Sequence, residues 1–147
     1  MKSALILLLS CLLFNACKKE EAGSTALSGN LINTNWFLVN SGFDVNNDGA
    51  IEVSNFSSLP ACQQDDYLHF NPNSILHIFD NTIQCTGRPQ RAEEFFSLSR
   101  NDTCLYIRQS GYFIIKKLTP TELHIRVATR AWGIPSTGSI LYYYEKR

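Results

Sequence analysis

The sequence predicts an all-β domain, an eight-stranded antiparallel up-and-down barrel, and three observations support this. Apolar residues alternate with polar ones at a period of two, in short segments rich in aromatic and β-branched side chains. Turn-forming residues separate these segments. No amphipathic helix of useful length competes with them, apart from a short turn around residues 27–33.

The predicted strands follow one another with connections that are mostly short enough for hairpins. They cover residues 36–39, 67–70, 75–79, 94–98, 104–107, 112–118, 123–127 and 140–144. The turns between them include Asn71–Ser74, Arg100–Asp102, Gln109–Gly111 and Thr119–Thr121. Closure of sequential antiparallel strands into a barrel leaves no unpaired edge, so a barrel is the natural arrangement.

The N-terminal segment has the pattern of an export signal. Lys2 precedes the apolar stretch Ala4–Phe14, which is too short to span a bilayer as a mature helix. The junction Phe14–Cys17 resembles the lipobox of bacterial lipoproteins, in which the cysteine becomes the lipidated N-terminus. We therefore expect Cys17 to carry acyl chains such as palmitate and to anchor the protein in the outer membrane.

Three regions follow from this pattern: a signal peptide at 1–16, a flexible tether at 17–30 and a barrel domain at 31–147. The tract Lys18–Glu21 resembles the tract after the lipid cysteine in surface-exported lipoproteins of Bacteroidota-type bacteria, which implies cell-surface exposure. The alternative is that the tract is only a solvated tether and the domain faces the periplasm. Removal of residues 1–16 removes one lysine, so 12 basic and 13 acidic side chains remain. This balance gives no electrostatic footprint for nucleic acid.

Three cysteines remain in the predicted domain: Cys62, Cys85 and Cys104. A hairpin with its tip at Pro72-Asn73 places Cys62 opposite residue 83, two residues from Cys85. The two are within bridging reach at the base of one hairpin, and the exported compartment is oxidising. We expect a Cys62–Cys85 disulfide, with Cys104 a free, small apolar side chain.

The segment Asp44–Glu52 matches the first half of an EF-hand-type calcium loop. Oxygen side chains stand at loop positions 1, 3 and 5, and Gly49 at position 6 allows the backbone to reverse. The candidate calcium ligands are Asp44, Asn46, Asp48, Ala50 through its carbonyl, and Glu52.

The second half of the calcium motif is missing. Asn55 stands at loop position 12, where a bidentate Glu is expected. Glu52, or Asp65 and Asp66 from the next segment, could compensate. No helical pattern flanks the loop, which excludes a true EF-hand. Two interpretations remain: a weak calcium site, or a loop whose Asn and Asp side chains bond to their own backbone.

In the order of their features, these residues resemble the lipocalin-like lipoproteins of Bacteroidota-type bacteria. The matching features are Trp36 after Leu31, the Asp44-x-Asn46-x-Asp48-Gly49 loop, Cys62-x-x-Asp65-Asp66 before the strand that ends at Phe70, Asn73-Ser74, Cys85, and Tyr112-x-Ile114-x-x-x-Leu118-x-x-x-x-Leu123. The resemblance covers residues 31–146. It implies a lipocalin-like barrel and names no ligand, since fold does not determine function.

The sequence shows no catalytic arrangement. With the hairpin tip at Pro72-Asn73, His69 and His77 face opposite sides of the sheet, which argues against a His–His metal pair. Asp65 and Asp66 are adjacent at a strand entry and point apart, whereas a general acid and base must converge on one substrate. We therefore expect that the protein is not an enzyme.

Two function classes remain open. In the first, the barrel binds a small, largely apolar ligand, and its aromatic side chains line the cavity. The candidate ligand-binding residues are Phe70, Phe79, Phe96, Tyr106, Phe113 and Tyr142. In the second, a cell-surface interaction module presents Tyr142–Tyr144 or the loop Ala131–Ile134 to a protein or glycan partner. A cavity above about 300 Å³ would favour the first class.

Overall fold

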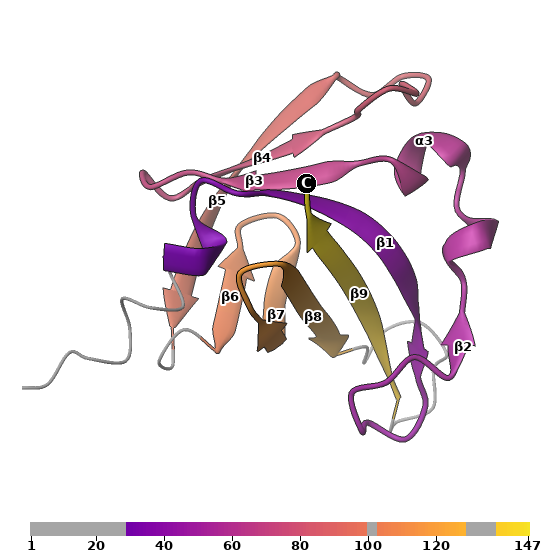
Figure 1. Ribbon diagram of the computed structural model, residues 1–147. Helices are drawn as coiled ribbons and strands as arrows, with labels where there is room; N and C mark the ends of the chain where they lie inside the picture. The colour runs from indigo at the N-terminus through magenta and orange to yellow at the C-terminus, as the bar shows by residue number, and fades with distance from the viewer. Residues whose placement is uncertain (1–28, 100–102, 129–137) are drawn as a thin grey trace, which may run out of the picture.

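Eight antiparallel strands close into a barrel in the computed structural model, which describes residues 29–99, 103–128 and 138–147 (Figure 1). The barrel strands are β1 (Asn35–Asp44), β3 (Tyr67–Phe70), β4 (Ile75–Phe79), β5 (Arg91–Ser99), β6 (Cys104–Ile107), β7 (Gly111–Leu118), β8 (Glu122–Ala128) and β9 (Ser139–Lys146). Each strand pairs with the next along the chain, and β1 pairs with β9 to close the sheet. The predicted all-β up-and-down barrel is confirmed.

Strand β1 closes the barrel because it is long enough to pair on both edges. Its antiparallel ladder with β9 runs from Trp36 opposite Lys146 to Asp44 opposite Ser139, with an irregularity between Leu38 and Asn40. Its other edge pairs first with β3 and then with the two-residue strand β2 (Val53–Ser54). The predicted strand 36–39 is therefore only the first half of β1.

One end of the barrel is closed by packed side chains. Residues 29–31 form a helical turn, and its last residue, Leu31, and Trp36 of β1 are both completely buried. The indole N–H of Trp36 donates to the Leu31 carbonyl at 3.1 Å, so the polar group of this buried ring is satisfied. Phe70 and Phe96 meet edge to face beside it, with ring centroids 5.0 Å apart. This end of the interior is a filled core.

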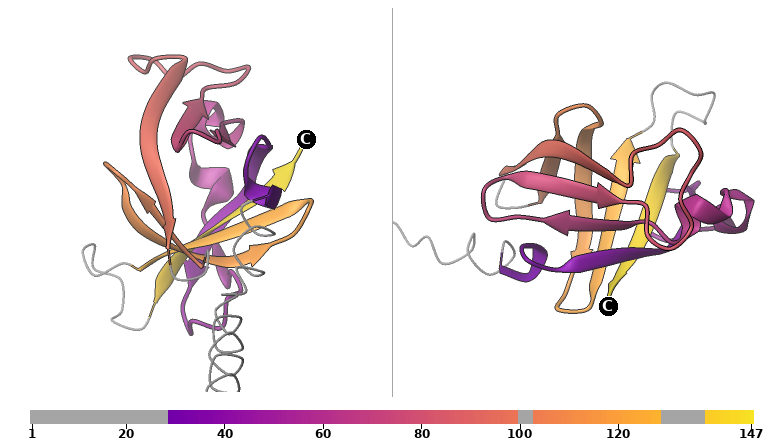
Figure 2. Two further views of the ribbon diagram at one scale, coloured as in Figure 1. Left: turned by 90° about the vertical axis from the view of Figure 1, so that its left-hand side faces the viewer. Right: turned by 90° about the horizontal axis from the view of Figure 1, so that it is seen from above.

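The two sides of the barrel wall cross at a steep angle. Figure 2 shows β3, β4 and β5 lying across β7, β8 and β9. Inward-facing positions alternate along each strand, and the buried cluster they form is Leu31, Trp36, Leu68, Phe70, Leu76, Phe96, Leu105, Ile107, Leu123 and Ile125.

The connection from β2 to β3 holds two short helical elements and the disulfide. It contains the 3₁₀ turn η1 (Phe56–Ser58) and the one-turn helix α3 (Ala61–Gln64). Cys62 in α3 is bonded to Cys85, with Cα atoms 5.2 Å apart, as predicted. Cys104 is a free thiol and is half-buried. The disulfide joins the entry of β3 to the β4–β5 connection.

The register of the β3–β4 hairpin differs by one residue from the predicted register. His69 lies directly opposite His77, and their rings are 6.4 Å apart on the same face of the sheet. The prediction that the two histidines face opposite sides is therefore wrong. A shift of one residue moves every side chain of a strand to the other face.

The turn explains this shift. The tip is the three-residue loop Pro72–Ser74, in which Ser74 has a positive φ of 65°. Its N–H donates to the Asn71 carbonyl at 3.2 Å, and the Asn71 N–H donates to the Ile75 carbonyl at 2.8 Å. Three-residue hairpin loops characteristically end on a left-handed residue. With Ser74 in this conformation the loop has three residues and not the predicted two, which shifts the pairing of the two strands by one residue.

Several predicted features lie outside the described residues. These are the signal peptide at 1–16, the lipidation site Cys17, most of the tether, the turn at 100–102 and the loop containing Trp132. Within residues 29–99, 103–128 and 138–147, no helix is long and apolar enough to cross a membrane.

Candidate functional site

A cavity of about 460 Å³ occupies the barrel beyond the filled core. Its apolar wall comes from seven elements or connections and is formed by Leu38, Leu59, Leu68, Leu76, Ile78, Ile107, Phe113, Ile125 and Val127. The polar residues that line the cavity are Gln63, Asp66, Arg88, Ser110, Tyr67, Tyr142 and Tyr144. The cavity exceeds the volume of about 300 Å³ at which small-molecule pockets begin.

Asp66 and Arg88 form the charged part of this wall. Their side chains approach to 3.8 Å, with Asp66 largely buried and Arg88 half exposed. Burial, together with the nearby Asp80 carboxylate, raises the pKa of Asp66 to about 6, and Arg88 opposes this rise only in part. The second Asp66 oxygen, Oδ1, is buried and has no hydrogen-bond partner. This carboxyl group is therefore poised to lose its charge in mildly acidic solution.

Asp65 and Asp66 make different contacts. Oδ2 of Asp65 accepts the backbone N–H groups of Thr82 at 2.7 Å and Ile83 at 2.9 Å. Asp65 thus holds the β4–β5 connection against the entry of β3, while Asp66 faces the cavity.

Two tyrosines of β9 bring phenol groups into the apolar interior. Tyr142 and Tyr144 lie on the inward face and both line the cavity. Burial raises the pKa of both phenols, and proximity to Asp66 and Tyr142 adds to the shift at Tyr144. Both groups stay protonated at neutral pH and can act as hydrogen-bond donors or acceptors to a bound molecule.

The structure brings together only part of the predicted ligand-binding set. Phe113 and Tyr142 line the cavity. Phe70 and Phe96 pack against each other in the filled core. The other two of the six contact neighbouring tyrosines: Phe79 stacks on Tyr67 with ring centroids 4.6 Å apart, and Tyr106 lies against Tyr112 at 4.8 Å with the rings tilted by 43°.

Sequence reasoning missed the aliphatic wall and the Asp66–Arg88 pair. The alternation within strands 67–70 and 75–79 could have placed Leu68 and Ile78 on the inward face together, but only with the correct hairpin register. Arg88 lies in the β4–β5 connection, outside any periodic segment, so no local pattern points to it.

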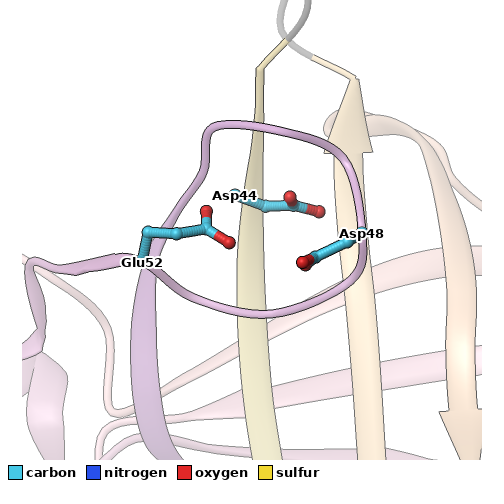
Figure 3. Close-up of side chains that lie close together, drawn as sticks. All are labelled: Asp44, Asp48 and Glu52. Carbon is cyan, nitrogen blue, oxygen red and sulfur yellow. The ribbon is translucent and has the colours of Figure 1, made fainter.

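The loop between β1 and β2 gathers three carboxylates. Ligand oxygens of Asp44, Asp48 and Glu52 all lie within 4.8 Å of one another. Figure 3 shows the three side chains pointing into the space that the loop encloses. Asp44 is completely buried, whereas Asp48 and Glu52 are exposed. Among the described residues, this is the one group of three His, Cys, Asp or Glu side chains close enough to share an ion.

Hydrogen bonds within the loop hold these carboxylates in place. The Glu52 carboxylate accepts the Val45 N–H at 2.6 Å, and Asp44 Oδ2 accepts the Gly49 N–H at 3.1 Å. Asp48 Oδ1 accepts the Ala50 N–H at 2.8 Å. The loop therefore contains the Asx-type turns that the alternative interpretation predicted, in addition to the carboxylate cluster.

The predicted ligand Asn46 and the residue at loop position 12, Asn55, both make hydrogen bonds to neighbouring protein groups. The side-chain oxygen of Asn46 accepts the Asp48 N–H at 2.8 Å, and its amide donates to the Asp48 carboxylate at 3.1 Å. Asn55, at the position where a Glu was expected, accepts the hydroxyl of Ser41 at 2.7 Å. Glu52, and not Asn55, supplies the third carboxylate of this loop.

The second cluster of titratable groups is the histidine pair on the outer face. His69 Nδ1 is 2.6 Å from Asn35 Oδ1, and His77 Nε2 is 3.4 Å from a Glu93 oxygen. Glu93 also pairs with Arg91 at 2.8 Å. Each imidazole ring therefore has a polar protein partner, and neither histidine belongs to the three-carboxylate group.

No protein-family model matches the chain, and no curated protein matches it. Fold and cavity define its class instead: a closed eight-stranded antiparallel barrel, compatible with a lipocalin-like binding module.

Proposed function

We propose that this protein is a membrane-anchored lipocalin-like lipoprotein that binds a small, mainly apolar molecule inside the barrel. The observation that carries the proposal is the cavity of about 460 Å³ beside a filled core. A barrel that served only as a rigid scaffold could fill its interior with the same side chains. Here the wall is aliphatic on most sides and polar at Asp66 and Arg88.

The distribution of polar groups supports an amphipathic ligand. Aliphatic side chains such as Leu76 and Ile125 favour an apolar body through the hydrophobic effect. The half-exposed guanidinium of Arg88 can pair with an anionic or hydrogen-bond-accepting group of the ligand. The buried oxygen of Asp66 that lacks a partner can accept a hydrogen bond from a ligand hydroxyl.

The sequence supports attachment to the outer membrane through Cys17. Two or three acyl chains would hold the domain stably, because each buried methylene contributes about 0.8 kcal/mol. The polar tether would let the domain stand off the membrane, and the Lys18–Glu21 tract supports exposure at the cell surface.

Binding of the neutral apolar dye N-phenylnaphthylamine to the purified full-length chain tests the cavity. Its fluorescence should rise on binding, and medium-chain fatty acids should displace it. Val127→Phe fills part of the cavity and should weaken dye binding by about tenfold or more. Val53→Phe is the matched control, because Val53 is exposed on β2 and does not line the cavity.

Equal dye affinity for both variants would contradict binding in the barrel. Absence of dye binding and of any thermal shift by fatty acids would contradict an apolar ligand altogether. Far-UV circular dichroism of each variant verifies that the barrel is intact.

A second candidate function, an interaction module, is supported by exposed aromatic side chains outside the predicted Tyr142–Tyr144 segment, while the other predicted segment, Ala131–Ile134, lies outside the described residues. Tyr143 stacks on His124 at 3.9 Å, while Tyr142 and Tyr144 face inward, so the three tyrosines form no outward patch. Phe95 and Tyr112, in contrast, are 55% and 68% exposed. The double variant Phe95→Ser/Tyr112→Ser should abolish pull-down of a surface partner if this module functions.

A further inference from the structure

We propose that the loop between β1 and β2 is a calcium-binding site, with Asp44, Asp48 and Glu52 as its carboxylate ligands. This site lies on the outside of the barrel wall and is separate from the proposed ligand cavity. The inference therefore does not rest on the proposed ligand-binding function.

Asp44 is the observation that separates this loop from an ordinary acidic turn. Its side chain is completely buried, and its Oδ1 atom has no hydrogen-bond partner. The other oxygen, Oδ2, already accepts Gly49 N–H and lies 3.4 Å from the Ser139 hydroxyl. A buried carboxylate oxygen without a partner is unfavourable, and a cation at this position would satisfy it.

The negative charge of the three carboxylates also supports a cation site. Among the described residues, no ion pair joins Asp44, Asp48 or Glu52 to a Lys, Arg or His nitrogen. The nearby Arg126 guanidinium contacts Asn47 Oδ1 at 3.5 Å instead. Three carboxylates within 4.8 Å of one another repel, and a divalent cation between them would reverse this repulsion.

The spacing and chemistry of the ligands favour calcium. All of the side-chain donors are oxygens, the ligand type of hard cations. Two oxygens on opposite sides of one calcium ion are about 4.6–5.2 Å apart, because Ca–O distances are about 2.3–2.6 Å. The limit of 4.8 Å among the three carboxylates is compatible with this. Magnesium requires shorter bonds and a nearly ideal octahedron, which an irregular loop with two exposed ligands suits poorly.

Such a site would clamp the loop to the barrel. The Tyr143 hydroxyl of β9 donates to the Gly49 carbonyl at 2.9 Å, and Asp44 lies opposite Ser139. Figure 3 shows the loop lying across β9. Calcium would therefore stabilise the region where β1 and β9 close the barrel.

Calcium titration of the purified full-length chain, after removal of metal with EDTA, tests the site. Calorimetry with CaCl₂ alone should give a Kd of about 10⁻⁴–10⁻³ M, the range of weak extracellular sites. Calcium at about 10 mM should raise the unfolding midpoint by about 4–10 °C. The same concentration of MgCl₂ should shift the midpoint by less than half as much.

Two variants at exposed positions separate ligation from folding. Asp48→Asn and Glu52→Gln should each weaken calcium binding by about tenfold or more and leave the metal-free unfolding midpoint nearly unchanged. Glu145→Gln is the matched control, because Glu145 is exposed on β9 and outside the loop. A calcium-independent midpoint in the starting protein would overturn the proposal. So would calcium binding that survives both loop variants, or an equal response to magnesium.

Discussion

At the residue scale, Gly42 shows how closely the acidic loop approaches the barrel wall. A Cβ atom at this position would collide with the Val53 carbonyl and with the Ile51 side chain. Gly42 lies opposite Leu141 of β9, which is completely buried although it belongs to the outward set of β9 positions. The return of the chain over β1 therefore covers apolar surface that would otherwise face water.

We expect Gly42→Ala to lower the free energy of unfolding by about 1–3 kcal/mol, because the added methyl group must displace backbone atoms of β2. Urea denaturation monitored by tryptophan fluorescence measures the change. Gly29→Ala is the control, because a Cβ at Gly29 meets no atom within 4 Å. An unchanged stability in Gly42→Ala would mean that the loop does not pack on β1 in solution.

Asp66 predicts a pH dependence with a definite sign. Its pKa is about 6 in the folded protein and about 3.8 as a free side chain, so the folded state holds the proton more tightly. Its contribution to stability is complete below about pH 4 and is lost as the pH rises through about 6. Asp66→Asn removes this titration.

Between pH 4 and pH 7, the free energy of unfolding of the wild type should therefore fall relative to that of Asp66→Asn. Urea denaturation at several pH values measures it, with Glu145→Gln as an exposed carboxylate control. A difference that is constant with pH would show that Asp66 has an ordinary pKa.

At the element scale, the β3–β4 hairpin shows how much depends on one turn. The local sequence predicts both strands and the turn between them. Ser74 in the left-handed conformation makes the tip three residues long, and this places His69 opposite His77. The same register turns Leu68 and Ile78 toward the cavity.

The disulfide ties this hairpin to the segment that precedes it. Cys62 and Cys85 are separated by 23 residues, and closing a loop of this size stabilises the folded state by about 3 kcal/mol in the chain-entropy model. We expect the double variant Cys62→Ser/Cys85→Ser to lose about 2–5 kcal/mol. Cys104→Ala, which removes the free thiol, should lose less.

Thermal unfolding with and without reductant measures these differences, and non-reducing peptide mapping identifies the bond. A bond from Cys104 to either partner would contradict the structure.

At the scale of the whole molecule, the proposed lipid anchor at Cys17 would determine where the barrel functions. Replacement of Cys17 by Ala should abolish incorporation of a fatty-acid analogue and release the protein from the membrane fraction. Metabolic labelling followed by fractionation measures both effects, with Cys11→Ala as the control within the predicted signal peptide. Labelling that persists in the Cys17 variant would refute the lipoprotein hypothesis.

Much of the barrel could be predicted because its signals are local. Alternation, turn residues and strand length predicted all eight barrel strands, and the spacing about the turn was sufficient for the disulfide despite the one-residue error in register. The second half of β1 and strand β2 were missed. Residues such as Ser41 and Gly42 have little strand propensity, and only pairing with β9 and β2 makes them extended.

The amino-acid sequence by itself determined the strand order, the cysteine pair and the acidic loop, because alternation, turn residues and residue spacing are local signals. Tertiary structure alone decided which side chains fill the barrel and which leave a cavity. Phe70 and Phe96 became core, whereas Asp66 and Arg88 became part of the cavity wall. It also decided that Asp44 is buried against β9. The physical reason is that burial and register depend on long-range closure of β1 on β9, and no local pattern specifies that contact.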